Sequence, residues 1–423
     1  MHIDGRSLAV IAATLCLPTA SAPGSPAGEF VARSSQSAVR APSPCPPDNA
    51  GLILPAGFCA TLFGEGLGSP RNLTVLPNGD VVAARQRGGV VLLRDTTGDG
   101  RADVISTFGT DAGTGIAYDD GHLYVGADDR ILRWTWTPGQ LVPGAAPQVV
   151  ARDLPDDGDH RAKPIAIRNG LVYVDFGSAT NSCQAANRRP RSPGLDPCRE
   201  LDARAGIWSF PAGGTDQGPA AGRRFATGLR NAEAFAFEPT TGILWMAVHG
   251  RDQLGDNWGY NDSLNAELPA EEFGPVPDGA DYGWPYCYYD QLQGKLVTAP
   301  EYGGDGRRQD RCRGKALPTI GFPGHWAPMS LAFSTGSAFP AEYRGGAFLA
   351  FHGSWNRAPL PQAGFRVVYI PFVAGRATGR FETFATARPG VTFRPSGVAV
   401  GPDGALYIGS DAAGKIWRVV TTP

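Results

Sequence analysis

The sequence predicts an all-β protein, a six-bladed β-propeller with disulfide-stapled loop insertions. The first observation is a unit that recurs six times, two alternating strands around a turn that often holds Asn-Gly, Asp-Gly or Gly-Gly. The second is composition, because 57 glycines, 37 prolines and only 18% charged residues suit many short strands joined by tight turns. The third is the spacing of the units, which where shortest approaches the length of a propeller blade.

Each unit is recognised by an apolar and polar alternation, the period of a half-buried strand, interrupted by residues that adopt positive φ. The stretch GFCATLFGEGL (57–67) is expected to complete the last blade, so that both ends of the chain close the ring. The alternative is an open sandwich, in which six similar units are hard to place. In chain order the units begin at Leu73, Gly115, Ile165, Ala234, Leu331 and Val398.

The N-terminus predicts export. Residues 1–22 combine Arg6, an apolar run and the small-residue site ASA, and they are interpreted as a signal peptide. Residues 23–50 are small, polar and proline-rich, so a flexible leader is expected before a propeller domain over 51–423. No later segment approaches the roughly 20 apolar residues of a membrane span, so no integral membrane segment is expected. A periplasmic or secreted protein follows.

Six cysteines remain after removal of the signal, and an oxidising compartment favours disulfides between them. Pairing of sequence neighbours is suggested, although the sequence alone leaves other pairings open. The insertions near 179–204 and 252–320 each hold a cysteine pair, so both are interpreted as stapled loops above one face. The suggested pairs are Cys45–Cys59, Cys183–Cys198 and Cys287–Cys312.

Charged residues stand at the entrance of four of the units, at a comparable offset before each strand. Blade symmetry should bring them around one axis, where loops carry function and arginines can bind carboxylates bidentately. Each residue alone has a structural interpretation as a solvated, capping or packed group. Together they predict a site for a multiply anionic ligand, whereas the net charge of −2 argues against nucleic acid. The residues are Asp159, His160, Arg230, Asn231, His325 and Arg394.

Five segments carry a resemblance to a known family. They are DHRAKPIAI, GLRNAEAFAF, DYGWPYC after HGRDQLGDN, FHGSWNR and FRPSGVAVGPDGALYIG. In this order they resemble the soluble sugar dehydrogenases that depend on pyrroloquinoline quinone (PQQ), within them the L-sorbosone dehydrogenase-like branch. The resemblance runs from about residue 55 to the C-terminus.

The resemblance implies an enzyme that oxidises a sugar or sugar aldehyde by hydride transfer to PQQ, with Ca²⁺ bound nearby. It implies that His160 is the general base and that Asp159 orients it. Arg230 would stabilise charge on the reduced quinone with Asn231 beside it, and Arg394 would pair with a PQQ carboxylate. Without a CxxCH haem motif, electrons would leave to a separate acceptor.

The resemblance also implies a calcium site in the segment HGRDQ, held largely by main-chain carbonyl oxygens, with Arg251 and Asp252 at the matching positions. Asn356 stands where the glucose-oxidising branch has a Lys beside PQQ, so a positive charge is absent there. Trp355 is a candidate to stack on the quinone or the sugar, and a core position is its alternative. His325 and His352 are candidates for a rearranged substrate pocket, so glucose is not assumed.

Two further interpretations remain open at the level of sequence. One is a calcium-dependent lactonase on the same propeller, and the other is a non-catalytic sugar-binding propeller. The segment DTTGDGRAD resembles an EF-hand loop, but a turn is favoured because no helices flank it. Its acidic and hydroxyl residues are Asp95, Thr97, Asp99 and Asp103.

Overall fold

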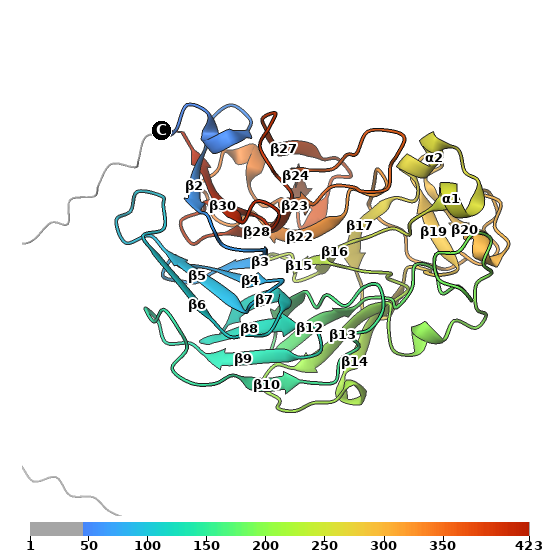
Figure 1. The fold of residues 1–423 in the computed structure, drawn as a ribbon, viewed down its shortest axis with the longest axis horizontal. Helices are drawn as coiled ribbons and strands as arrows, with labels where there is room; N and C mark the ends of the chain where they lie inside the picture. Colours follow the sequence, from blue (N-terminus) through green and yellow to red (C-terminus); the bar gives the residue numbers. More distant parts are fainter. Residues whose placement is uncertain (1–44, 423) are drawn as a thin grey trace, which may run out of the picture. The chain divides into compact units, whose positions relative to one another are not determined.

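The computed structural model describes residues 45–422 (Figure 1). The predicted signal peptide and residues 23–44 of the predicted leader lie outside this range. Residues 45–50 are described and belong to the folded unit, since Asn49–Gly51 form a 3-10 turn and Cys45 is disulfide-bonded. The structured part therefore begins before residue 51. No helix among the described residues is long and apolar enough to cross a membrane.

Six sheets form the blades of a propeller, as the sequence predicts, and all their strand pairs are antiparallel except one at the outer edge of the third blade (Figure 1). The first strand of each repeated unit is the innermost strand of its blade, and consecutive inner strands contact one another around a closed ring. In chain order the inner strands are β3 (Pro70–Val75), β7 (Gly113–Asp119), β11 (Ile165–Arg168), β15 (Ala234–Phe237), β22 (Pro328–Phe333) and β28 (Pro395–Val400).

The outer strands follow each inner strand in order and complete the blades. The first blade continues from β3 through β4 (Val81–Arg85), β5 (Val90–Arg94) and β6 (Val104–Phe108). The second continues from β7 through β8 (His122–Ala127), β9 (Ile131–Thr135) and β10 (Gln148–Ala151). The third blade continues from β11 through β12 (Leu171–Phe176), β13 (Gly206–Pro211), β14 (Arg223–Thr227) and β18 (Ala280–Asp281). The fourth continues from β15 through β16 (Leu244–Val248), β17 (Glu271–Val276) and β21 (Ile320–Phe322). The fifth blade continues from β22 through β23 (Ala347–Phe351), β24 (Arg366–Ile370), β27 (Glu382–Ala387) and β1 (Leu52–Ile53). The sixth continues from β28 through β29 (Leu406–Ser410), β30 (Lys415–Thr421) and β2 (Phe58–Gly64).

The turns at the far ends of the inner strands explain why the sequence forms hairpins there. Asp120 and Gly121, between β7 and β8, have φ of 43° and 73°. Asn169 and Gly170, between β11 and β12, have φ of 51° and 71°. Two consecutive residues of positive φ define the type I′ turn, whose twist matches that of the flanking strands. The Asp-Gly and Asn-Gly pairs of the sequence are therefore the hairpin turns.

The ring closes where the two ends of the described chain meet. Strand β2 pairs with β30 over six residues of register, from Phe58 opposite Thr421 to Gly64 opposite Ile416, which confirms the predicted closure. Phe58 is buried among Phe339, Tyr343 and Phe384 in edge-to-face contacts. An N-terminal segment thus supplies the outer strand of the C-terminal blade.

Insertions decorate the face at which the inner strands begin. Residues 177–205 separate β12 from β13, and residues 249–270 separate β16 from β17. The second insertion holds the short helices α1 (Leu254–Trp258) and α2 (Asp262–Glu267). A further excursion before β21 holds the hairpin of β19 (Cys287–Asp290) and β20 (Lys295–Thr298), and β25 (Phe372–Val373) and β26 (Arg376–Ala377) form a small hairpin elsewhere. All three suggested disulfides are present.

The EF-hand-like segment is a turn between β5 and β6. The Asp95 carboxylate accepts hydrogen bonds from the main-chain N–H groups of Thr97, Gly98 and Gly100. Asp103 accepts from the N–H of Thr96. Strands rather than helices flank the segment, which confirms the predicted turn.

Replacing Cys45 and Cys59 together by serine is expected to lower the free energy of unfolding by about 3 kcal/mol, since the bridge closes a short loop in the unfolded chain. The bridge also fixes the position of β2, which pairs with β30, so the amides of β30 should exchange faster in the variant than in the parent protein. Hydrogen exchange of residues 415–421 measures this. The matched control is the Cys287→Ser, Cys312→Ser variant, whose bridge lies outside the blades; unchanged β30 protection in the first variant would contradict the prediction.

Candidate functional site

The four predicted segments converge at one face because of hairpin geometry. In each blade the start of the inner strand lies beside the end of the second strand, as in Ile165 opposite Val174 and Ala234 opposite Ala247. A cavity of about 270 Å³ opens at this face. Its lining residues come from several blades and both insertions: Asp159, His160, Arg188, Arg230, Asn231, Glu233, His249, Gly250, Asp252, Glu271, His325, Ala327, Trp355 and Asn356.

A buried ion pair between Arg230 and Asp252 forms the floor of the site. Arg230 Nη2 lies 2.9 Å from Asp252 Oδ2, with side chains 4% and 13% exposed. Arg230 also donates to the carbonyl oxygens of Gly250 (2.8 Å) and Asn181 (3.1 Å) and to the Asn181 side chain (3.0 Å). The guanidinium is therefore held in one orientation by two segments of the chain, one at Asn181 and one at residues 250–252.

The pKa of Asp252 lies well below its usual range. Burial by itself would raise this pKa, but the charge of Arg230, a hydrogen bond from His325 and the charge of Arg188 outweigh it. Burial lowers the pKa of Arg230, and Asp252 opposes that shift. Both groups therefore remain charged at neutral pH, and their pairing compensates the loss of water.

His160 is a neutral imidazole with one defined tautomer. Its Nδ1 lies 2.8 Å from the carbonyl oxygen of Ser178, which can only accept, so Nδ1 carries the proton and Nε2 does not. Burial, and then the charge of Arg230, lowers the His160 pKa well below its ordinary value. The site thus contains an unprotonated ring nitrogen beside a fixed cation.

The orienting partner of His160 is Ser178 and not Asp159, in contrast to the expectation from the resemblance. Asp159 accepts from Arg188 Nε at 2.8 Å and from Asn187 Nδ2 at 3.2 Å. Neighbouring residues in an extended segment direct their side chains differently, so adjacency in sequence does not make Asp159 a partner of His160. Asp159 still lines the cavity.

Two amide side chains bring unpaired acceptors to the cavity. The Oδ1 atoms of Asn231 and Asn356 are buried and have no hydrogen-bond partner among the described residues. Their Nδ2 groups are engaged, Asn356 with Asp252 Oδ1 at 2.9 Å and Asn231 with His249 Nδ1 at 3.4 Å. Buried acceptors without donors are costly, so these oxygens indicate a ligand with N–H or O–H groups.

Two more predicted residues line the same cavity. Trp355 is 64% exposed, which places it at the surface and not in the core. His325 is buried, with φ of 67°, and its Nε2 lies 2.7 Å from the carbonyl oxygen of Asn265. Its Nδ1 lies 3.6 Å from Asp252 Oδ1. The structure therefore brings both beside the residues that were predicted with them.

Arg394 lies outside the residues that line the cavity and supports one of its loops. Its guanidinium donates to the carbonyl oxygens of His352 (3.1 Å) and Gly353 (2.8 Å) and packs over the ring of Phe365. These contacts hold the segment that continues to Trp355. Arg394 thus faces main-chain acceptors that no sequence pattern identifies.

His352 belongs to a network of ionisable side chains across the ring, and it is the only member that was predicted from the sequence. His352 Nε2 lies 2.8 Å from Asp411, which pairs with Arg71 at 3.0 Å, and Arg71 pairs with Glu233 at 3.2 Å. Arg71 enters the first blade in the stretch SPRN, the same Arg-Asn dipeptide as in GLRN. That repetition was the available signal.

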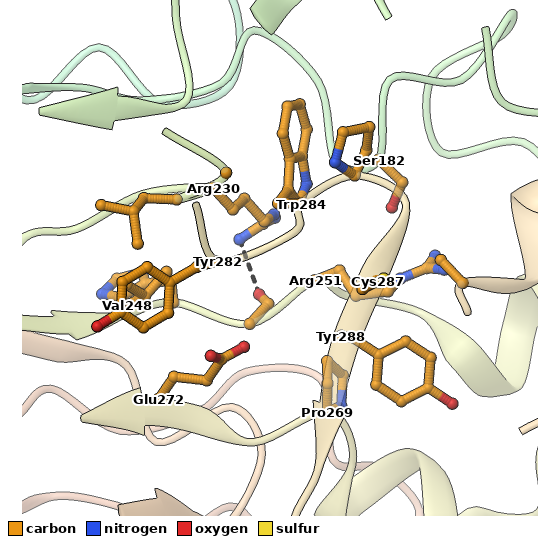
Figure 2. A pocket seen from close by; sticks show the side chains of 16 residues that line it. Ser182, Arg230, Val248, Arg251, Pro269, Glu272, Tyr282, Trp284, Cys287 and Tyr288 are labelled. Carbon is orange, nitrogen blue, oxygen red and sulfur yellow. Dashed lines mark hydrogen bonds between the residues drawn. The ribbon is translucent and has the colours of Figure 1, made fainter. Parts of the chain in front are cut away.

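Arg251 points away from the candidate site. Its guanidinium forms a buried pair with Glu301 at 2.6 Å, and Arg251 lines a separate, smaller cavity of about 20 Å³. Figure 2 shows this second cavity, with Arg230 and Arg251 among the residues that line it, together with Trp284 and Tyr288. Arg230 therefore lines both cavities, whereas Arg251 lines only the second one and stabilises the insertion through its pair with Glu301.

Asp252, one of the two residues predicted to hold calcium, has its oxygens engaged by donors and does not fit a metal ion in this structure. Asp252 accepts from Arg230, Arg188 and Asn356 through its carboxylate, and from Asn181 and Arg251 through its carbonyl oxygen. Calcium needs six to eight oxygen ligands, and these oxygens already face donors. Within residues 45–422 no group of three His, Cys, Asp or Glu side chains is arranged to hold a metal.

Residues 52–422 match the family described as TrAA12-like. The chain belongs to this family. The TrAA12-like chain is 22% identical to the pyrroloquinoline quinone-dependent sugar dehydrogenase of Hypocrea jecorina, over 88% of this chain and 91% of that protein. It is 26% identical to the pyrroloquinoline quinone-dependent pyranose dehydrogenase of Coprinopsis cinerea over 38% of this chain. It spans only 26% to 48% of the length of the first curated relatives that it matches.

Solved structures show the same fold. A calcium structure of Trichoderma reesei family AA12 matches with a TM-score of 0.74 and 19% identity, covering 88% of this chain and 97% of that one. The holo form of the pyranose dehydrogenase PQQ domain from Coprinopsis cinerea matches with a TM-score of 0.72 and 20% identity, covering 89% and 98%. The propeller of this TrAA12-like protein is therefore shared along almost its whole described length.

Gly177→Ala should disrupt the site, because a Cβ there would lie 2.6 Å from His160 Cβ and 3.0 Å from Asn231 Oδ1. Overpacking of this kind is expected to lower the free energy of unfolding by about 1–3 kcal/mol. Denaturant unfolding measures the loss. Gly144→Ala is the matched control, since no atom lies within 4 Å of its added Cβ; equal stability of both variants would contradict the close approach.

Proposed function

We propose that the protein is an exported quinoprotein that oxidises a sugar or sugar aldehyde, with PQQ as its cofactor and His160 as the general base. One observation carries the proposal: an imidazole whose unprotonated nitrogen lies in a cavity beside a fixed guanidinium and two unpaired amide oxygens. The Hypocrea and Coprinopsis relatives are named as pyrroloquinoline quinone-dependent dehydrogenases, which supports the cofactor class.

The residues of the cavity fit PQQ by their chemistry. Arg188 and Arg230 bring positive charge for a tricarboxylate, and Arg188 Nη2 makes no hydrogen bond to another described residue. The exposed indole of Trp355 offers a flat apolar face to a planar ring system. Asn231 Oδ1 is an acceptor for an N–H or O–H group of the cofactor. We assign these four residues to cofactor binding.

When bound, PQQ supplies the two-electron acceptor to which the hydride of the substrate passes. His160 Nε2 takes the proton from the hydroxyl group on the carbon that is oxidised, and the C=O bond forms as the hydride leaves. The Ser178 carbonyl holds the ring so that Nε2 faces the cavity as an acceptor. Arg230 stabilises negative charge that develops nearby, in a site with little water to screen it.

The substrate class is inferred from the excess of acceptors in the cavity. Asn356 Oδ1 is unpaired, and the carboxylates of Asp159 and Glu233 also line the site. Hydroxyl groups of a sugar donate to such oxygens, whereas an apolar substrate would leave them without donors. A sugar or a sugar aldehyde in its hydrated form meets this requirement.

The proposal extends to the cell compartment and the electron acceptor. Three disulfides support an oxidising compartment, consistent with the periplasm or the outside of the cell. The sequence contains no CxxCH motif, so we assign reoxidation to a separate carrier.

Reconstitution tests the function directly. Apo-protein is mixed with PQQ, and dye reduction is measured with aldoses, sorbosone and alditols; turnover of at least one sugar is expected. Hydrolysis of a lactone without PQQ would instead indicate a lactonase. Binding of PQQ and sugar without turnover would indicate a binding propeller. The set of acidic side chains that a metal-dependent lactonase needs is not found among the described residues.

His160→Ala should reduce the turnover number at least about a hundredfold, because general bases contribute rate factors of about 10² to 10⁴. Binding of PQQ should change little, since the charged groups around the cofactor remain. Dye reduction and equilibrium dialysis against PQQ measure the two effects separately. His122→Ala, on the exposed turn of the second blade, is the control. Parental turnover by His160→Ala would show that another group is the base.

The pH dependence should follow the lowered pKa of His160. Protonation of Nε2 at acid pH removes the base, so kcat/KM should fall only well below pH 6.5 and stay level above it. The measurement is kcat/KM for dye reduction between about pH 4 and pH 8. A half-maximal rate at or above pH 6.5 would contradict the assignment.

A further inference from the structure

We infer that Arg188 occupies the place of a metal ion beside Asp252, so that this protein binds PQQ without calcium. The inference rests on the proposed function for the identity of the cofactor. It concerns a residue from the stapled insertion that no sequence pattern singled out. Arg188 lies between two acidic residues of the site, Asp159 and Asp252, and binds both.

The first step is the geometry of the bridge. Arg188 Nε lies 2.8 Å from Asp159 Oδ2, and Arg188 Nη1 lies 3.0 Å from Asp252 Oδ2. The three side chains are 27%, 25% and 13% exposed, so the bridge is partly shielded from water. One guanidinium thus fills the gap between two carboxylates, the position that a divalent cation takes in an acidic site.

The second step is the charge around Asp252. Its Oδ2 accepts from both Arg188 and Arg230, and its Oδ1 accepts from Asn356. A cation bound to this carboxylate would lie beside two fixed guanidinium groups, and the repulsion would be only partly screened. Two arginines and two aspartates already balance here. A divalent ion is therefore disfavoured by charge as well as by the lack of free oxygens.

The third step is the rigidity of the loop that carries Arg188. The disulfide Cys183–Cys198 encloses it, and Leu195 N–H donates to the Cys183 carbonyl at 2.8 Å. The N–H of Arg188 donates to Gln184 Oε1 at 3.1 Å, and the backbone has φ of 57°. The guanidinium is therefore positioned before the ligand arrives, which lowers the entropic cost of binding.

The consequence for binding follows from the remaining donors. Arg188 Nη2 has no hydrogen-bond partner among the described residues, while Nε and Nη1 are held by Asp159 and Asp252. The Nη2 group, which lies between these two engaged nitrogens and carries two N–H donors, can donate to a carboxylate of the cofactor. Arg188 is thus a positioning residue for Asp159 and Asp252 and a binding residue for PQQ.

The experiment is equilibrium dialysis of PQQ against the apo-protein, in EGTA and in millimolar CaCl₂. For the parent protein, Kd values that differ less than threefold are expected, and weakening by threefold or more in EGTA would overturn the inference. Absence of PQQ binding in both buffers would overturn the proposed function and the inference with it, which separates that failure from a calcium requirement.

Arg188→Gln keeps polar hydrogen bonding and removes the charge. It is expected to weaken PQQ binding at least tenfold in EGTA, and added calcium should recover part of the loss because Asp159 and Asp252 each lose one positively charged partner. A purely structural defect would not respond to calcium. Arg189→Gln, the exposed neighbour on the same loop, is the matched control and should bind like the parent. Unchanged binding by Arg188→Gln, with both variants folded by circular dichroism, would overturn the inference.

Discussion

The site depends on one buried ion pair, Arg230 with Asp252. A charge removed from water needs a compensating partner, and each member of this pair has one within 3 Å. The pair also joins segments far apart in sequence, since Arg230 precedes the fourth inner strand and Asp252 lies in the insertion after β16. Asn181 and Asn356 bind to it from two further loops. The cavity thus forms around an ion pair whose two side chains are each fixed by hydrogen bonds to other segments of the chain.

The propeller explains how such distant residues meet. Each hairpin returns the chain to the face where its inner strand began, so the segments around 160, 230, 325 and 394 arrive at one face. Closure by β2 and β30 fixes the number of blades and the distances between these segments. A ring without this strand pairing would leave the charged network of Arg71, Asp411 and His352 unsupported.

The chemistry that the site supports reflects a division of labour between cations. Arg230 has almost all of its donors committed to protein groups and acts as a fixed charge. Arg188 binds Asp159 and Asp252 through Nε and Nη1, and its Nη2 group has no hydrogen-bond partner among the described residues. His160 is kept neutral by burial and by its nearness to Arg230. A base that stays unprotonated beside a positive charge suits proton removal coupled to hydride transfer.

The sequence by itself determined the architecture and the entrance residues of the site. The alternation of strands and the Asn-Gly and Asp-Gly turns are local properties, and the repeated offset of His160, Arg230 and His325 follows from them. The suggested cysteine pairs were confirmed, and each of them joins neighbouring cysteines in the sequence. Only the tertiary structure decided the direction of each side chain. In the folded protein Asp159 faces Arg188, Arg251 faces Glu301, and Arg394 faces main-chain carbonyl oxygens. The fold also brings Arg188 to the site from a loop whose sequence has no strand or helix periodicity. Such directions depend on contacts between residues far apart in the chain, which no local pattern records.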